Sequence, residues 1–209
     1  PSSGSPFTVG HGLGSPPKMI MVKNITGSAQ NWGVWHTGIG FGKYLQLNTT
    51  ISQATANLVT ATSNTTFSTY HDHHTSGVDL IAYCFAEKKG FSKFGSYVGN
   101  GNANGGFLYC GFKPAFLLLK NSSDGAKNWE MLDNRRPSTG QNPADDILFP
   151  DTSDAESASQ TDRLVDFVSN GVKIRGNSAQ MNGNGNTHIF MAFAEEPLVA
   201  SNGVPATAR

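Results

Sequence analysis

The stretch Pro17–Asn24, which reads PKMIMVKN and is followed by Asn31-Trp32, occurs twice in this chain. Its second copy is Pro114–Asn121, which reads PAFLLLKN and is followed by Asn128-Trp129. The proline, lysine, asparagine and tryptophan keep one constant offset. The sequence therefore predicts an internal duplication of roughly a hundred residues and not a solenoid of short repeats.

A second pair of matching stretches closes each copy. Leu80–Glu87 reads LIAYCFAE, and His188–Glu195 reads HIFMAFAE at a slightly larger offset, which indicates an insertion in the second copy. We therefore predict two structurally equivalent units, residues 1–93 and residues 94–209, the latter with a C-terminal tail.

Composition restricts the class of protein. Charged residues make up 14% of the 209 residues, Gly occurs 24 times, and 15 basic side chains balance 15 acidic ones. Low charge with many Gly, Asn, Ser and Thr residues is typical of loop-rich β proteins. The balanced charge argues against nucleic-acid binding, and the apolar runs are much shorter than the roughly 20 residues of a membrane helix, which argues against membrane insertion.

Short apolar or β-branched runs bounded by turn residues predict strands throughout. We expect an all-β fold of two antiparallel β-sandwich-like units. Short helical turns are expected only at Ala144–Leu148 and Ser153–Ser159. The predicted strands are Lys18–Asn24, Gly33–His36, Tyr44–Asn48, Thr66–Tyr70, Leu80–Glu87, Phe107–Tyr109, Ala115–Asn121, Trp129–Leu132, Arg163–Val168, Gly171–Arg175 and Thr187–Glu195.

The first copy lacks one strand of the second. Phe94–Gly101 alternates in a strand-like way at its start, and no counterpart precedes Phe7. We expect this to leave an open sheet edge at Phe7–Val9, where a neighbouring chain or an upstream segment adds a strand.

Three strings carry a resemblance to a known family. Tyr83–Glu87, Phe91–Gly101 and Gly111–Phe116 resemble a repeat family common in tail and fibre proteins of marine bacteriophages, especially those of cyanobacteria. The ending, Phe193–Leu198 with Asn202–Pro205, is similar to that of such virion proteins.

The resemblance implies a virion structural protein, a tail fibre, spike or other external appendage without cofactor. It implies a location on the virion surface after assembly in the bacterial host cytoplasm. Its partners would be other copies, most simply in a homotrimer, other virion proteins and a host-surface glycan. The alternative is a carbohydrate-binding or polysaccharide-depolymerising domain.

Candidate catalytic and metal-binding groups are few. Glu87 and Glu195 occupy matching positions, and paired carboxylates are what a glycosidase uses. Duplication alone explains their symmetry, and we expect each to pair with the matching lysine, Lys23 or Lys120. We therefore predict no catalytic residue.

The segment from Tyr70 includes His71, His73 and His74, but it lacks a third metal ligand at fixed spacing, so we predict no metal site. Recognition is expected in loops that differ between the copies, because loops diverge where a scaffold meets solvent. These loops are Tyr70–Thr75 and Asn134–Ala158. The candidate receptor-binding residues are Tyr70, His71, His73, His74, Arg135 and Arg136.

The repeated tryptophans and the two cysteines are predicted to have structural roles. Trp32 and Trp129 recur with the lysine-asparagine strand and are expected to be buried anchors. Cys84 and Cys110 lie inside apolar strands and are expected to be buried free thiols.

Overall fold

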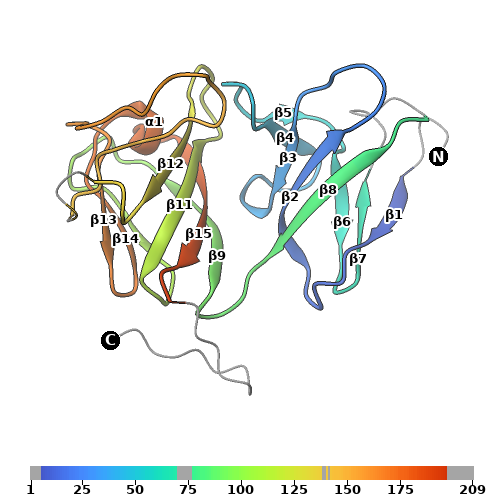
Figure 1. Ribbon diagram of the computed structural model, residues 1–209, viewed down its shortest axis with the longest axis horizontal. Helices are drawn as coiled ribbons and strands as arrows, with labels where there is room; N and C mark the ends of the chain where they lie inside the picture. The colour runs from blue at the N-terminus through green and yellow to red at the C-terminus, as the bar shows by residue number, and fades with distance from the viewer. Residues whose placement is uncertain (1–5, 70–76, 138–139, 141, 197–209) are drawn as a thin grey trace.

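The computed structural model describes residues 6–69, 77–137, 140 and 142–196 and consists almost entirely of antiparallel strands (Figure 1). The predicted all-β class is confirmed. The strands form two sandwiches, each with a larger and a smaller sheet.

The first sandwich packs a five-stranded sheet against a three-stranded one. The larger sheet has the order β5-β4-β3-β2-β8 and the smaller one β1-β7-β6. Apolar side chains pack between them, including Ile20, Trp35 and Phe67. The elements are β1 (Phe7–Gly10), β2 (Pro17–Asn24), β3 (Gly33–His36), the 3₁₀ turn η1 (Thr37–Ile39), β4 (Lys43–Gln46), β5 (Ala54–Thr55), β6 (Val59–Thr62), β7 (Thr66–Thr69) and β8 (Leu80–Ala86).

The second sandwich has a four-stranded sheet, β12-β11-β15-β9, and a three-stranded one, β10-β14-β13. Its core includes Leu117, Phe167 and Phe190. The elements are β9 (Ser92–Val98), β10 (Phe107–Tyr109), β11 (Pro114–Asn121), β12 (Trp129–Asp133), β13 (Val165–Val168), β14 (Gly171–Ile174), the short helix α1 (Ala179–Asn182) and β15 (Thr187–Ala194).

The two larger sheets share one register. In the first, Lys23 of β2 pairs with Ile81 of β8, and in the second, Lys120 of β11 pairs with Ile189 of β15. Both ladders also have an irregularity after the initial proline. Strand positions are therefore equivalent, as the sequence repeat predicts.

The repeated apolar run is explained by burial on both faces of its strand. Ile20 of β2 points into the first sandwich, whereas Met19 and Met21 pack with Leu118 of β11 in a core shared by both sandwiches. A strand covered on both faces needs apolar residues at successive positions, not at alternate ones.

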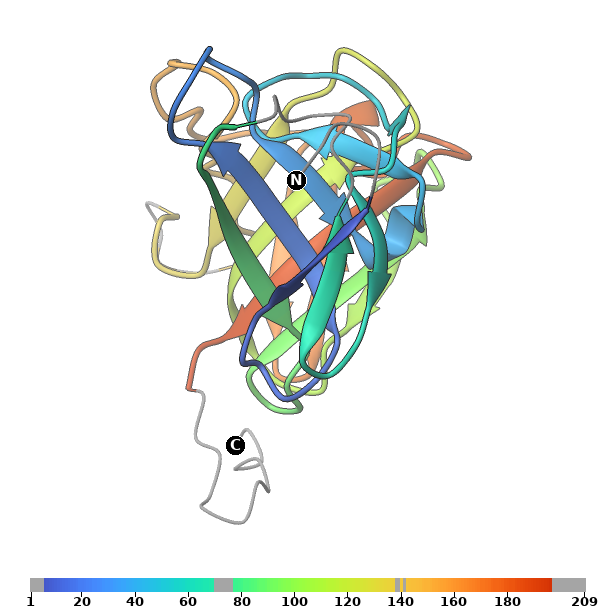
Figure 2. The same ribbon diagram turned by 90° about the vertical axis from the view of Figure 1, so that its right-hand side faces the viewer.

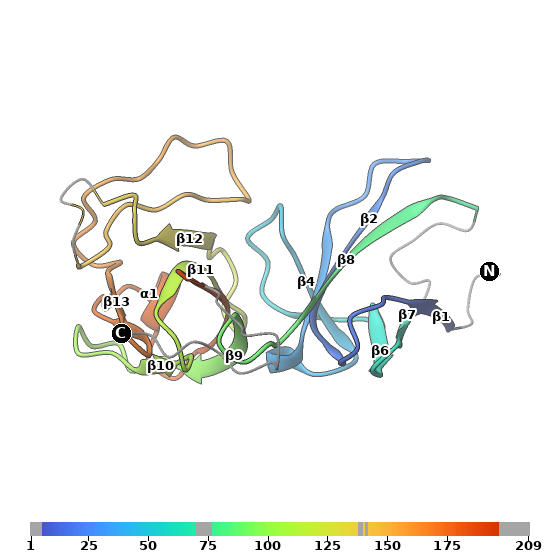
Figure 3. The same cartoon turned by 60° about the horizontal axis from the view of Figure 1, so that its bottom comes forward.

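The larger sheets face each other across this shared core (Figure 3). Side-chain hydrogen bonds cross it: Trp129 Nε1 donates to the Gln46 carbonyl at 2.8 Å, and His36 Nε2 lies 3.1 Å from the Phe190 carbonyl. Because the Gly38 amide donates to His36 Nδ1 at 2.9 Å, Nε2 carries the proton and is the donor to Phe190. Backbone bonds also join the sandwiches, from the Gln53 amide to the Ser122 carbonyl at 2.7 Å and from the Lys127 amide to the Thr50 carbonyl at 3.3 Å.

Burial of His36 predicts a loss of stability in acid. Desolvation lowers its pKa from 6.5 to about 4, so protons bind the unfolded chain more tightly. The contribution is complete above pH 6.5 and is lost as the pH falls through 4, by up to about 3 kcal/mol. Urea unfolding at pH 7 and pH 4.5 should show a smaller decrease in His36→Gln than in the parent chain. Equal decreases would contradict this assignment.

The helical turns lie at other places than the sequence predicted. Ala144–Leu148 and Ser153–Ser159 are not helical; their backbones make isolated bridges such as Met131–Leu148 and Ile147–Ser157, which satisfy the polar groups without a helix. The helical turns lie instead at η1 and α1, where His36 and Ser178 accept a bond from a backbone amide.

Phe7–Val9 forms an edge strand, as predicted, but the strand missing from the first copy would pair with β8 and not with β1. β1 pairs with β7 just as its counterpart β10 pairs with β14. Among the described residues, β8 pairs only with β2, whereas its counterpart β15 pairs with both β11 and β9.

Candidate functional site

The repeated lysine-asparagine-tryptophan motif holds a loop in place. Lys23 Nζ donates to the carbonyl of Gln30, and Lys120 Nζ donates to the carbonyl of Lys127, in each case just before the Asn-Trp pair. Asn121 adds an acceptor for the Ser123 and Asp124 amides at 3.3 and 3.1 Å. The motif therefore fixes the loop that joins two adjacent strands.

The predicted lysine–glutamate pairs are wrong. Glu87 pairs with Lys93 at 2.8 Å, and Glu195 pairs with Lys113 at 2.6 Å. Lys23 and Lys120 lie near the ends of their strands, beside the loop that follows. Each therefore donates to a carbonyl of that loop and not to a glutamate. The hydrogen bond and charge of Lys113 lower the pKa of Glu195, which favours an ionised carboxylate and not a proton donor.

Arg135 and Arg136 lie side by side but differ in their surroundings. The Arg136 guanidinium is clamped by Asp133, at 2.9 Å, and by Glu156. Those partners raise its pKa. Arg135 is 83% exposed and reaches one carboxylate oxygen of Glu195 at 3.3 Å. Only Arg135 is thus free to contact another molecule.

Arg135 borders a shallow surface cavity of about 290 Å³. Asn142 in the wall of this cavity is hydrogen-bonded to the backbone of Phe167. Its Nδ2 donates to the Phe167 carbonyl at 2.9 Å, and its Oδ1 accepts from the Phe167 amide at 2.9 Å. Glu195 is the one carboxylate among the lining residues that the structure describes. The lining residues are Lys113, Asn134, Arg135, Pro137, Gly140, Asn142, Ala144, Phe167 and Glu195.

The other four predicted receptor-binding residues, Tyr70, His71, His73 and His74, lie outside the described residues. Within the described ranges, no group of three or more His, Cys, Asp or Glu side chains is arranged to hold a metal ion. In the same part of the chain, no helix is long and apolar enough to cross a membrane.

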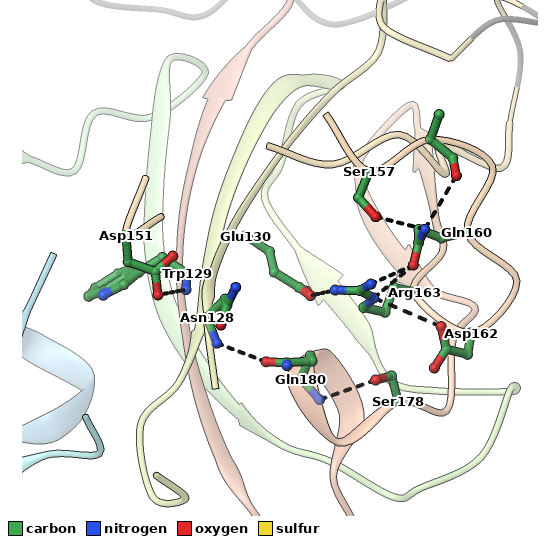
Figure 4. Close-up of polar contacts among 11 residues, drawn as sticks. Asn128, Trp129, Glu130, Asp151, Ser157, Gln160, Asp162, Arg163, Ser178 and Gln180 are labelled. Atoms are coloured by element: carbon green, nitrogen blue, oxygen red, sulfur yellow. Dashed lines mark hydrogen bonds and ion pairs between the residues drawn. The ribbon is translucent and has the colours of Figure 1, made fainter. Parts of the chain in front are cut away.

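A buried charged cluster was not predicted (Figure 4). Glu130 of β12 is fully buried, and one of its oxygens lies 3.4 Å from the Arg163 guanidinium. Arg163 also donates to Gln160 at 3.0 Å and lies over the ring of Phe149. Burial raises the pKa of Glu130 to about 7 even though Arg163 acts in the opposite direction.

Like many active sites, this cluster contains groups with shifted pKa values. Unlike an active-site acid or base, however, Glu130 is not accessible to solvent or to a substrate. Burial lowers the pKa of Lys120 to about 8 and raises that of Asp151, which accepts a bond from the Trp129 amide at 3.2 Å. Glu130 lines neither the cavity beside Arg135 nor the larger one described below. A group sealed from solvent cannot exchange protons with a substrate, so we interpret the cluster as structural.

One sequence signal pointed to this cluster. Glu130 follows the repeated Asn-Trp pair directly, at the position that Gly33 occupies in the first copy. A charged residue inside an otherwise apolar strand pattern suggests a buried ion pair.

Both cysteines are free, as predicted; Cys110 is buried and Cys84 is half-buried. The tryptophan prediction holds for Trp129, which is 1% exposed. Trp32 is only half-buried and stacks on Tyr83 with ring centroids 6.0 Å apart. The deeply buried indole of the first sandwich is that of Trp35 in β3, which packs in the core between the two sheets of that sandwich.

The fold and surface define a tandem β-sandwich protein. A family model described as "Domain of unknown function (DUF7483)" matches residues 1–197, and the chain belongs to this family. No curated protein and no solved structure matches it.

Proposed function

We propose that the chain is a structural module of an external appendage of a bacteriophage virion, a tail fibre or spike that contacts the host surface. The observation that carries the proposal is the repetition of one sandwich in one register, joined through a shared apolar core, with divergent loops at its surface. Such a scaffold presents recognition loops on a stiff body. The resemblance of its sequence strings to tail and fibre repeats supports the same role.

Within this role, Arg135 and the cavity beside it form the host-contacting surface. A guanidinium exposed to 83% supplies hydrogen-bond donors for the hydroxyl or carboxylate groups of a surface glycan. The single carboxylate among the lining residues, Glu195, is held ionised by Lys113. Binding of a glycan is therefore better supported than its cleavage, which uses two opposed carboxylates.

The assembly that we propose is a homo-oligomer, a trimer in keeping with the resemblance, attached to other virion proteins on the virion surface. Sedimentation of the purified chain alone does not test this assembly, because neighbouring segments of a fibre also drive it. Locating the chain in a virion reconstruction does, and three copies around a fibre axis are expected.

Substitution of Arg135 tests the host contact. Arg135→Ala should weaken binding of the fluorescently labelled protein to host cells or purified envelope glycan at least about tenfold, since a charge-assisted hydrogen bond contributes roughly 1.5–3 kcal/mol. The matched control is Arg175→Ala, because Arg175 is also exposed and makes one ion pair, with Asp166 at 3.4 Å. Equal binding by both variants and the parent chain would overturn the assignment, provided their urea midpoints agree.

A further inference from the structure

The edge of β8 is unprotected. Its seven residues, LIAYCFA, contain neither a charge nor a proline, and Ile81 and Tyr83 are 36% and 45% exposed. Natural sheet edges are usually protected by lysine, proline, a bulge or a short strand, because free backbone groups attract further strands. Among the described residues, β8 pairs on one side only, with β2. Figure 2 shows it at the margin of its sheet.

A cavity of about 640 Å³ adjoins this edge. It lies between the two sheets of the first sandwich, where β8 and β2 face β1 and β7. Leu80, Ala82 and Cys84 contribute the β8 side of its wall. The other lining residues are Phe7, Val9, Gly10, His11, Gly12, Val22, Thr65, Phe67 and Thr69.

The second sandwich shows what occupies the equivalent place. There β9 pairs with β15 over its whole length, and Tyr97, opposite His188, packs against the core and donates to the Met181 carbonyl. β9 ends at Val98, nine residues before β10 begins at Phe107. In the first sandwich, none of the described strands takes the place of β9, since β8 pairs there only with β2.

One pair of positions indicates the shape of the missing side chain. Phe190 of β15 lies opposite Gly95 of β9, and a Cβ at Gly95 would come within 2.7 Å of the Phe190 ring. The register places Ala82 of β8 at the position of Phe190, since these residues pair with Val22 and Leu119. The large side chain of this pair is therefore absent from β8, and the cavity lies where it would be.

We propose that β8 and the cavity beside it form an acceptor site for one extended strand of the β9 type. The strand pairs antiparallel to β8 and inserts a large apolar side chain opposite Ala82. Backbone hydrogen bonds supply affinity and the cavity supplies specificity, as in other strand-addition complexes. This proposal does not depend on the virion assignment.

A second copy of the chain fits the site less well. Antiparallel pairing of two β8 strands about a twofold axis would present Leu80, Ala82 and Cys84 of each copy to the other's cavity. Two of those three side chains are small and leave most of the 640 Å³ unfilled. We therefore assign the site to a strand with a large central side chain.

A pair of peptides tests the proposal on the full 209-residue chain. The first is a fluorescent peptide of Phe91–Asn100, and the second is the same peptide carrying Gly95→Phe. Fluorescence anisotropy should show that the Gly95→Phe peptide binds at least about tenfold more tightly, because it buries an additional phenyl group. Cys84, which lines the cavity, should become protected from a maleimide when this peptide is bound.

The Ala82→Phe variant is the reciprocal control. It recreates the Phe–Gly pair of β15 and β9, so it should bind the unmodified peptide more tightly than the Gly95→Phe peptide. Reversal of the preference would establish both the register and the site. Equal or absent binding of both peptides to the parent chain would overturn the proposal. Protection of Cys84 by self-association alone, rising with protein concentration, would assign the edge to a second copy and also overturn it.

Discussion

Replacing Arg163 with methionine is expected to lower the free energy of unfolding at pH 8 by about 3–5 kcal/mol. The variant leaves Glu130 fully buried without its cationic partner, while the second oxygen of Glu130 already lacks a hydrogen-bond partner among the described residues. Methionine keeps most of the apolar contact with Phe149, so the lost charge dominates. Urea unfolding followed by tryptophan fluorescence measures the change.

The loss should shrink in mild acid. The pKa of Glu130 is raised to about 7 in the folded chain, above its unfolded value near 4.5. Its favourable contribution is therefore complete below pH 4.5 and disappears as the pH rises through 7. At pH 5 the carboxyl of the variant is protonated, and the difference from the parent chain should fall to about 1–2 kcal/mol. A loss that is the same at both pH values would contradict this account of the ion pair.

Glu130→Gln is the matched control. It removes the buried charge but keeps a side-chain oxygen facing Arg163, so its stability relative to the parent chain should rise by up to about 3 kcal/mol between pH 4.5 and pH 8. His36 has the opposite pH dependence in nearly the same range, because its pKa is lowered to about 4. Comparison of single variants at each pH separates the two contributions.

The sequence allowed prediction of the repeated framework but not of its polar interior. Runs such as those of β2 and β11 are long, apolar and duplicated, so their strand character and equivalence follow from local pattern. The pair of Glu130 and Arg163 joins residues 33 positions apart on β12 and in a loop. The apolar neighbours of Glu130 suggest a buried ion pair, but nothing near it in the sequence identifies Arg163 as the partner, because the path of the connecting loop decides which cation reaches it.

The same distinction explains the error over Lys23 and Lys120. Their repetition predicts a shared role, and each indeed donates to the carbonyl seven residues later. The choice of a nearby carbonyl over a matching glutamate depends on the loop conformation. The glutamates form ion pairs with other lysines, Glu87 with Lys93 and Glu195 with Lys113.

The final prediction compares equivalent tryptophans. Trp129→Ala should lower the free energy of unfolding by about 3–5 kcal/mol, because it opens a cavity in the core between the sandwiches and removes the bond to Gln46. Trp32→Ala, at the same repeat position, should cost less than about 2 kcal/mol, since it loses mainly the stacking on Tyr83.

The difference follows from where each indole lies relative to the opposite sandwich. Trp129 lies against Met19 and the neighbouring side chains of the first sandwich, whereas Trp32 contacts the exposed ring of Tyr83 within its own sheet. Guanidinium unfolding of both variants measures the two losses under the same conditions. Equal losses would show that repeat position, and not packing between the sandwiches, determines the contribution of these residues. A larger loss for Trp129→Ala would show that packing of its indole against the opposite sandwich stabilises the chain.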